Sequence, residues 1–181
     1  MSRPLVIVLG GTRSGKSRFG RERARDLAGD GRVVYVATAV PGDPELDERI
    51  ALHRRDRPAS WRTVDAMPDL AATIRGVAPG DTILLDGLTL WVSWLIGDER
   101  PSVETLVDGP IAALRAALRE HSGPVVVVSD EVGLGLVPMD LIGRAFRDIL
   151  GIAHQQLVAD SDEAWFMVAG RALALPPGAD R

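Results

Sequence analysis

Short, predominantly apolar runs alternate with longer amphipathic stretches along this chain. Runs of this kind, without a polar position at every second residue, are typical of strands buried on both faces of a parallel sheet. We expect strands at residues 5–9, 33–38, 82–85, 125–129 and 165–169. Because parallel strands need helical crossovers, the pattern predicts an α/β fold around a mostly parallel sheet.

The stretches between these runs have helical spacing. We expect helices at residues 17–28, 45–55, 103–121 and 140–160. The first of them should end near Gly29, and Pro44 breaks the chain just before the second. There is no internal repeat, no low-complexity segment and no linker long enough to separate two units. The sequence therefore predicts one nucleotide-binding domain over residues 1–181.

A phosphate-binding motif follows the first predicted strand. Residues 10–17 read GGTRSGKS, a full match to G-x-x-x-x-G-K-[ST]. Gly10 and Gly15 permit close approach of the backbone to phosphate, Lys16 would neutralise β/γ-phosphate charge, and the Ser17 hydroxyl would hold Mg²⁺. A glycine-rich turn before a helix is the alternative. The expected nucleotide-binding residues are Gly10, Gly11, Thr12, Arg13, Ser14, Gly15, Lys16 and Ser17.

Composition supports a special role for Lys16. It is the only lysine among 21 basic residues, the others being arginine. An ammonium and a planar guanidinium differ in shape and in donors, so one retained lysine suggests that its site needs the compact cation. The formal net charge of −4 gives no general attraction to nucleic acid or to an anionic membrane, and we expect neither as a partner.

Two absences narrow the function classes further. Without cysteine the chain has no disulfide scaffold, no thiolate metal site and no cysteine nucleophile. The early apolar run at residues 5–9 is too short for a signal segment or a membrane span. We therefore expect a cytoplasmic protein.

A carboxylate ends the predicted strand at residues 82–85. Phosphate-loop enzymes use an acid in this position to reach Mg²⁺, so Ser17 and Asp86 are the expected metal-binding residues. The alternative is that Asp86 caps the helix that follows.

His53 lies among several arginines. Packing in the core beside Leu46 and Ile50 is one interpretation of its position. The other is chemical: neighbouring cations lower the pKa of an imidazole, and the neutral ring can attack a nucleotide α-phosphorus and carry the group covalently. We expect His121 and His154 at the surface or in capping positions, and the four tryptophans in the core.

A glycine-rich, carboxylate-bearing loop follows the strand at residues 125–129. It reads SDEVGLGLVP over residues 129–138. Ligands of α/β sheets lie at the carboxyl ends of strands, although a simple turn is the alternative interpretation.

Five segments of the chain together resemble one family. They are GGTRSGKS, the segment from Arg49 to Thr63, LDGLTLWV at residues 85–92, SDEVGLGLVP, and FRD at residues 146–148. It is the bifunctional adenosylcobinamide kinase and adenosylcobinamide-phosphate guanylyltransferase family of cobalamin biosynthesis. The resemblance implies a RecA-like phosphate-loop fold, ATP or GTP as co-substrates, and a homo-oligomer, a trimer in the family pattern. It also implies two reactions: phosphorylation of adenosylcobinamide, then transfer of GMP from GTP to adenosylcobinamide phosphate through a histidine.

The same resemblance implies site residues. His53 corresponds to the guanylylated histidine, and Leu52 precedes it where some relatives have a second histidine. Asp65 stands where the family pattern has Glu, and Asp130 where it has Asn. The implied guanine-nucleotide contacts are Ala37, Thr38, Ala39, Arg54, Arg55, Asp56, Arg57, Asp65 and Asp86.

Two other functions remain open at this point. One is a single-activity kinase of another small alcohol, which would not become covalently labelled by nucleotide. The other is a nucleotide-gated binding protein. An extended partner-binding surface or long insertions would support it, and neither is evident in the sequence. The chain has no N-K-x-D guanine motif, so a preference for GTP rests on the family resemblance.

Overall fold

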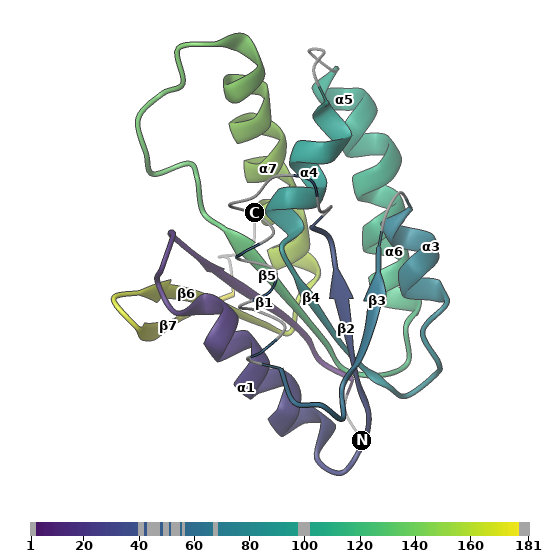
Figure 1. Ribbon diagram of the computed structural model, residues 1–181. Helices are drawn as coiled ribbons and strands as arrows, with labels where there is room; N and C mark the ends of the chain where they lie inside the picture. Colours follow the sequence, from purple (N-terminus) through teal and green to yellow (C-terminus); the bar gives the residue numbers. More distant parts are fainter. Residues whose placement is uncertain are drawn as a thin grey trace.

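The computed structural model describes residues 3–39, 42, 48, 51, 55, 57–66, 69–97 and 102–177. Its centre is a seven-stranded sheet with the order β3-β2-β4-β5-β1-β6-β7, shown in Figure 1. Every neighbouring pair is parallel except β6 and β7, which form an antiparallel hairpin. The strands are β1 (Leu5–Gly10), β2 (Val33–Ala37), β3 (Arg62–Asp65), β4 (Thr82–Asp86), β5 (Val125–Asp130), β6 (Glu163–Val168) and β7 (Arg171–Leu175).

Helices cover both faces of this sheet (Figure 1). On one face α1 packs through Ala24 against alternate strand residues such as Val6 and Val8. On the other face a larger core joins Ile7 and Leu9 to the remaining helices. β1 is therefore buried on both sides, which explains its uninterrupted apolar sequence. The helices are α1 (Lys16–Ala28), α3 (Leu70–Arg75), α4 (Leu88–Ile96), α5 (Val103–Leu106), α6 (Ala112–Glu120) and α7 (Leu141–Asp160).

The five predicted strands are confirmed, with ends shifted by one or two residues. β3 and β7 were not predicted: the residues of both strands are mostly exposed, and β3 has no apolar run, although β7 reads RALAL. α3 and α4 were not predicted either. The helix predicted at residues 45–55 falls mainly outside the described residues.

One predicted helix, at residues 103–121, contains a wider turn. Between α5 and α6 lies a π-helical turn, η1 (Val107–Ile111), that includes Pro110. Proline has no amide hydrogen and its ring collides with the carbonyl four residues earlier, so a wider turn lets the helix continue past it. The helix predicted at residues 140–160 is confirmed as α7, whose N-cap Asp140 accepts a hydrogen bond from the Gly143 amide at 2.6 Å.

The topology brings the carboxyl ends of β1, β4 and β5 to one edge of the sheet. This edge carries the phosphate loop, Asp86 and the loop from residue 131 to residue 140, which projects beyond the sheet in Figure 1. In the part of the chain that the structure describes, no helix is long and apolar enough to cross a bilayer.

Candidate nucleotide site at the carboxyl edge of the sheet

Two glycines set the shape of the phosphate loop. A Cβ on Gly10 would lie 2.6 Å from the carbonyl oxygen of Met167 and 2.7 Å from Ser14 Oγ, too close for any side chain. Gly15 has φ 95° and is the N-cap of α1, a left-handed conformation that glycine adopts without strain. The motif glycines are therefore required by the local geometry.

The loop leaves hydrogen-bonding groups available at the start of α1. No side chain caps this helix. Ser14 Oγ is buried and has no hydrogen-bond partner among the residues that the structure describes. A helix N-terminus with unsatisfied donors is favourable for an anion, so the loop fits a phosphate group.

Lys16 lies over the loop and is ion-paired. Its Nζ donates to the carbonyl oxygen of Gly11 at 3.3 Å and contacts Asp130 Oδ1 at the end of β5. The lysine side chain is 13% exposed, whereas that of Asp130 is 32% exposed. The only lysine in the chain is thus at the phosphate loop, as the motif predicts, and a carboxylate neutralises it there.

Asp86 connects the loop to the neighbouring strands. Ser17 Oγ donates to Asp86 Oδ1 at 3.2 Å, and the Tyr35 hydroxyl donates to Asp86 Oδ2 at 3.1 Å. The N-cap of α4 is Gly87 and no side chain caps that helix, so the capping alternative for Asp86 is wrong. Ser17 and Asp86 present hard oxygen donors side by side, which is the chemistry that Mg²⁺ prefers.

Tyr35 is a site residue that the sequence analysis missed. Its ring supports the Arg57 guanidinium, whose Cζ lies 3.4 Å from the ring centre. Burial and the negative charge of Asp86 raise the pKa of Tyr35, although Arg57 opposes the shift. The hydroxyl therefore stays protonated and remains a donor to Asp86. One indication of a special role is present in the sequence: Tyr35 is the only tyrosine in the chain, and it lies within a predicted strand.

The predicted segment Ala37–Ala39 lies at the same edge. Thr38 is buried, and its Oγ1 donates to the carbonyl oxygen of Gly87 at 2.7 Å. The carbonyl oxygen of Ala37 accepts from the amide of Ala66 at 2.9 Å. These bonds tie the end of β2 to the turns that follow β4 and β3.

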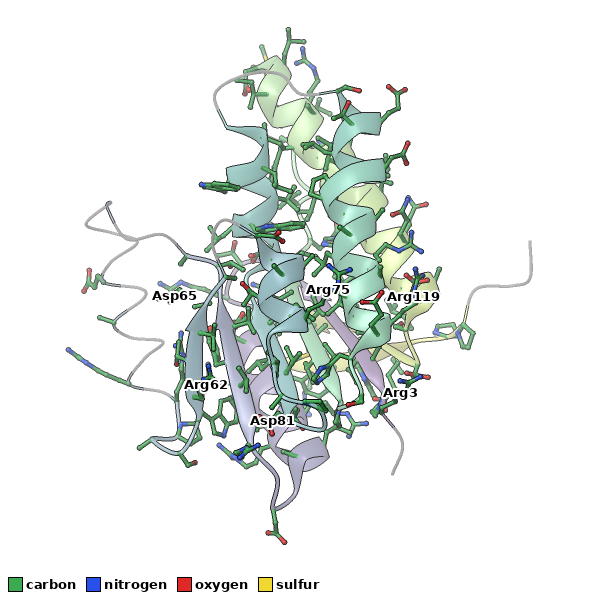
Figure 2. The ribbon with its side chains drawn as sticks, turned by 90° about the vertical axis from the view of Figure 1, so that its right-hand side faces the viewer. Arg3, Arg62, Asp65, Arg75, Asp81 and Arg119 are labelled. Atoms are coloured by element: carbon green, nitrogen blue, oxygen red, sulfur yellow. The ribbon has the colours of Figure 1, made fainter. Side chains whose placement is uncertain are left out.

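Asp65 ends β3 and is exposed, and Figure 2 shows it on the same strand as Arg62. Arg55 is also exposed, whereas Arg57 is partly buried. The other predicted residues of the arginine-rich segment, His53, Arg54 and Asp56, lie outside the described residues.

The expectation that His154 is a surface or capping residue is wrong. It is 5% exposed, because α7 presses it against β5. Its Nε2 is hydrogen-bonded to Ser129 Oγ at 2.7 Å, and its Nδ1 lies 3.4 Å from Glu131 Oε2. Burial lowers the pKa of His154, against the charges of Glu131 and Asp130, which raise it.

The other aromatic and histidine expectations have mixed outcomes. His121 stands at the C-cap of α6, as expected, with Nε2 2.8 Å from the carbonyl oxygen of Asp81. Trp91 is buried in the core, but Trp94 is 47% exposed, so its predicted core position is wrong. Trp61 and Trp165 are partly buried against the core under α1.

The end of β5 is fastened to the phosphate loop by its backbone. The Glu131 amide donates to the carbonyl oxygen of Gly10 at 3.0 Å, and Glu131 Oε1 accepts from the Gly133 amide at 2.6 Å. Within the described ranges no group of three or more His, Asp or Glu side chains forms a metal cluster. The metal chemistry of this edge would therefore depend on the Ser17 and Asp86 pair together with a bound nucleotide.

Solved structures share this architecture at low sequence identity. The flagellar accessory protein FlaH from Methanocaldococcus jannaschii matches with a TM-score of 0.52 and 13% identity, covering 96% of this chain and 78% of that one. The ATPase domain of a second protein matches with a TM-score of 0.50 and 15% identity, covering 91% of this chain and 69% of that one. These likenesses show the fold, a RecA-like phosphate-loop fold, as the sequence predicts.

Sequence comparison is more specific. A bifunctional adenosylcobalamin biosynthesis protein, CobP of Pseudomonas aeruginosa, is 42% identical over 172 residues, covering 93% of this chain and 95% of the relative. CobU of Salmonella typhimurium, which has the same description, is 39% identical over 178 residues, covering 92% and 96%. The model of the cobinamide kinase / cobinamide phosphate guanyltransferase family matches residues 6–175. With the phosphate loop, Asp86 and the end of β5 assembled at one edge, the chain belongs to this family.

Proposed function

We propose that this chain performs both reactions of its family. It transfers the γ-phosphoryl group of ATP or GTP to the side-chain hydroxyl of adenosylcobinamide, and it then transfers GMP from GTP to the resulting phosphate, giving adenosylcobinamide-GDP. The observation that carries the proposal is the assembled phosphate site of Lys16, Ser17 and Asp86 in a chain that the family model matches over residues 6–175.

The kinase step uses the phosphate loop. The backbone amides at the start of α1 and the Ser14 hydroxyl bind phosphate oxygens, and Lys16 exchanges Asp130 for the β- and γ-phosphates. Ser17 and Asp86 are the residues that would hold Mg²⁺, which supplies charge neutralisation on the phosphates when bound. The substrate hydroxyl attacks the γ-phosphorus and the nucleoside diphosphate leaves.

The guanylyl transfer step uses His53. An imidazole nitrogen attacks the α-phosphorus of GTP, pyrophosphate leaves, and a phosphate oxygen of adenosylcobinamide phosphate then attacks the same phosphorus and frees the histidine. The contact between Arg57 and Tyr35 supports this step, because it holds the end of the arginine-rich segment against the phosphate site. The nucleotide contacts proposed for it are Ala37, Thr38, Ala39, Arg54, Arg55, Asp56, Arg57 and Asp65.

The assembly that we propose is a homo-oligomer, a trimer by the family pattern, with no nucleic acid or membrane partner. The net charge of −4 supports the second part, since it offers no general attraction to polyanions. Sedimentation equilibrium would give the mass of the assembly.

Covalent labelling tests the function directly. Wild-type protein incubated with α-labelled GTP and Mg²⁺ should retain label after denaturing electrophoresis, and the bond should be labile in acid and stable in base, as a phosphoramidate is. His53→Ala should lose this label while still phosphorylating adenosylcobinamide from γ-labelled ATP. His121→Ala is the matched control and should label normally.

Each contrary outcome has a clear meaning. Label that persists in His53→Ala would place the nucleophile elsewhere. A wild-type protein that phosphorylates adenosylcobinamide but never acquires label would be a single-activity kinase, and a protein that does neither would refute the proposal.

A further inference from the structure

The loop between β5 and α7 exposes large apolar side chains. Leu134 is 80% exposed, Leu136 is 96% exposed and Met139 is 95% exposed, and Val137 is mostly exposed as well. Figure 1 shows this loop projecting from the carboxyl edge of the sheet beside α7. Several large apolar side chains exposed together in one loop often mark a binding surface. We name residues 133–139 the apolar arm.

The apolar arm is held in place by two arginines of α7. Arg147 donates to the carbonyl oxygens of Leu136 at 3.1 Å and Gly133 at 2.8 Å. Arg144 donates to those of Pro138 at 2.9 Å and Met139 at 2.8 Å. The backbone carbonyls are thus satisfied from the helix while the apolar side chains face solvent. A surface ordered in this way costs little conformational entropy when a ligand binds.

The apolar arm begins beside the phosphate loop. Asp130, three residues before Gly133, contacts Lys16, and the amide of Glu131 is bonded to the carbonyl of Gly10. Glu131 also accepts from the Gly133 amide. A molecule with its reacting hydroxyl at the phosphate loop would therefore have this arm next to it.

The side chains of the arm are uncharged and mostly apolar, so they favour contact with an apolar surface. No side chain from residue 132 to residue 139 carries a charge, and Gly133 and Gly135 alternate with Leu134 and Leu136. Glycines between large apolar side chains let a planar group approach the backbone. Arg144 and Arg147 direct their guanidinium groups at backbone carbonyls of the arm.

We infer that the apolar arm binds the corrin ring of the substrate. This inference rests on the proposed function, in which the substrate has a polar hydroxyl or phosphate on one side and a broad macrocycle on the other. The polar end is placed by the phosphate loop, and the macrocycle packs on Leu134, Leu136 and Met139. Binding of this kind transfers the exposed apolar area away from water.

A double substitution at the most exposed positions tests the arm. Leu136→Ser with Met139→Ser removes two apolar contacts, and because both residues lie almost wholly in solvent the fold should be retained. The matched control is Val168→Ser with Leu173→Ser on the β6–β7 hairpin, where the side chains are also exposed. Equilibrium dialysis of cobinamide should give a Kd at least about tenfold higher for the arm variant, equal to about 1.4 kcal/mol. The control variant should bind as wild type does, and the Kd for Mg-ATP should be unchanged in both.

Three outcomes would overturn the inference: an unchanged cobinamide Kd in the arm variant, no cobinamide binding by the wild-type protein, and a loss of assembled mass in sedimentation velocity. The last would assign the arm to a contact with a second copy. Dialysis needs no turnover, so its result is separate from the fate of the proposed function. A wild-type protein that binds cobinamide through the arm but transfers no phosphoryl group would refute the kinase proposal and leave this inference standing.

Discussion

The guanidinium of Arg57 stacks on the ring of Tyr35, with 3.4 Å between Cζ and the ring centre. The same phenol donates to Asp86, which accepts from Ser17 of the phosphate loop. Two contacts therefore link the arginine-rich segment to the proposed metal-binding carboxylate. In the proposed nucleotide site, these contacts place Arg57 and the phosphate loop on the two sides of Asp86.

Lys16→Ala should abolish most kinase turnover. The substitution removes the one ammonium at the phosphate loop, and loss of a single preorganised electrostatic donor typically reduces the rate by about a hundred- to a thousandfold. Initial rates with γ-labelled ATP measure it, and thermal melting of the variant controls for folding. Turnover within a few-fold of wild type would show that the loop does not act on the transferred group.

Asp86→Asn should raise the Mg²⁺ concentration that gives half-maximal activity. The amide is a weaker ligand than the carboxylate and no longer offers two equivalent acceptors to Ser17 and Tyr35. Mg²⁺ titrations of both proteins measure the shift, and Asp26→Asn, at an exposed position of α1, is the matched control. Superimposable titration curves for wild type and Asp86→Asn would remove Asp86 from the metal site.

The phenol of Tyr35 should resist ionisation in the folded protein. Burial and the charge of Asp86 raise its pKa, and it is the only tyrosine, so phenolate absorbance reports this residue alone. Near pH 10, where a free tyrosine is about half ionised, the native protein should show little phenolate, and the signal should appear on unfolding in guanidinium. Circular dichroism at the same pH confirms that the fold persists.

Linkage gives a second readout of the same shift. Because the folded state holds the Tyr35 proton more tightly, its contribution to the free energy of unfolding is full below about pH 10 and falls as the pH rises further. Tyr35→Phe should flatten that decline. Half-ionisation near pH 10 in the native protein would contradict the burial of the phenol beside Asp86.

His154 should make the free energy of unfolding fall at acidic pH. Burial lowers its pKa, so the folded state favours the neutral imidazole. The contribution is therefore full above about pH 6.5 and is lost as the pH falls below it, since the unfolded chain binds the extra proton. Urea unfolding at several pH values should show this slope in wild type and a weaker one in His154→Gln. An identical slope in the variant would mean that another group titrates.

How far the sequence predicts this structure depends on where each signal is encoded. β1, β4 and β5 are buried on both faces, so each is visible in the sequence as an apolar run. The phosphate loop is visible because phosphate binding requires its glycines, lysine and serine at fixed spacing. The edge strand β3 reads RTVD and is mostly exposed, which leaves no periodic pattern to detect. α4 is apolar on nearly every side, so it lacks the amphipathic period of a surface helix.

Contacts between residues that are distant in the sequence could not be predicted from local sequence patterns. Arg57 and Tyr35 meet because β2 and the segment before β3 are brought together by the sheet. His154 reaches Ser129 because α7 returns across the end of β5. The tertiary fold brings the members of each pair together. The residues next to a histidine or tyrosine in the sequence do not indicate its distant partner.

The order of the strands has a consequence for biosynthesis. β1 is the first strand to leave the ribosome, yet its neighbours are β5 and β6: Leu5 pairs with Val125, and Val6 with Glu163. Most of the polypeptide must therefore emerge before either edge of β1 is paired, and long-range parallel pairing of this kind is slow and prone to aggregation. The nascent chain therefore carries its phosphate loop on an unpaired apolar strand until β5 has emerged, and a ribosome stalled before β6 would release a chain in which the second edge of β1 has no partner strand.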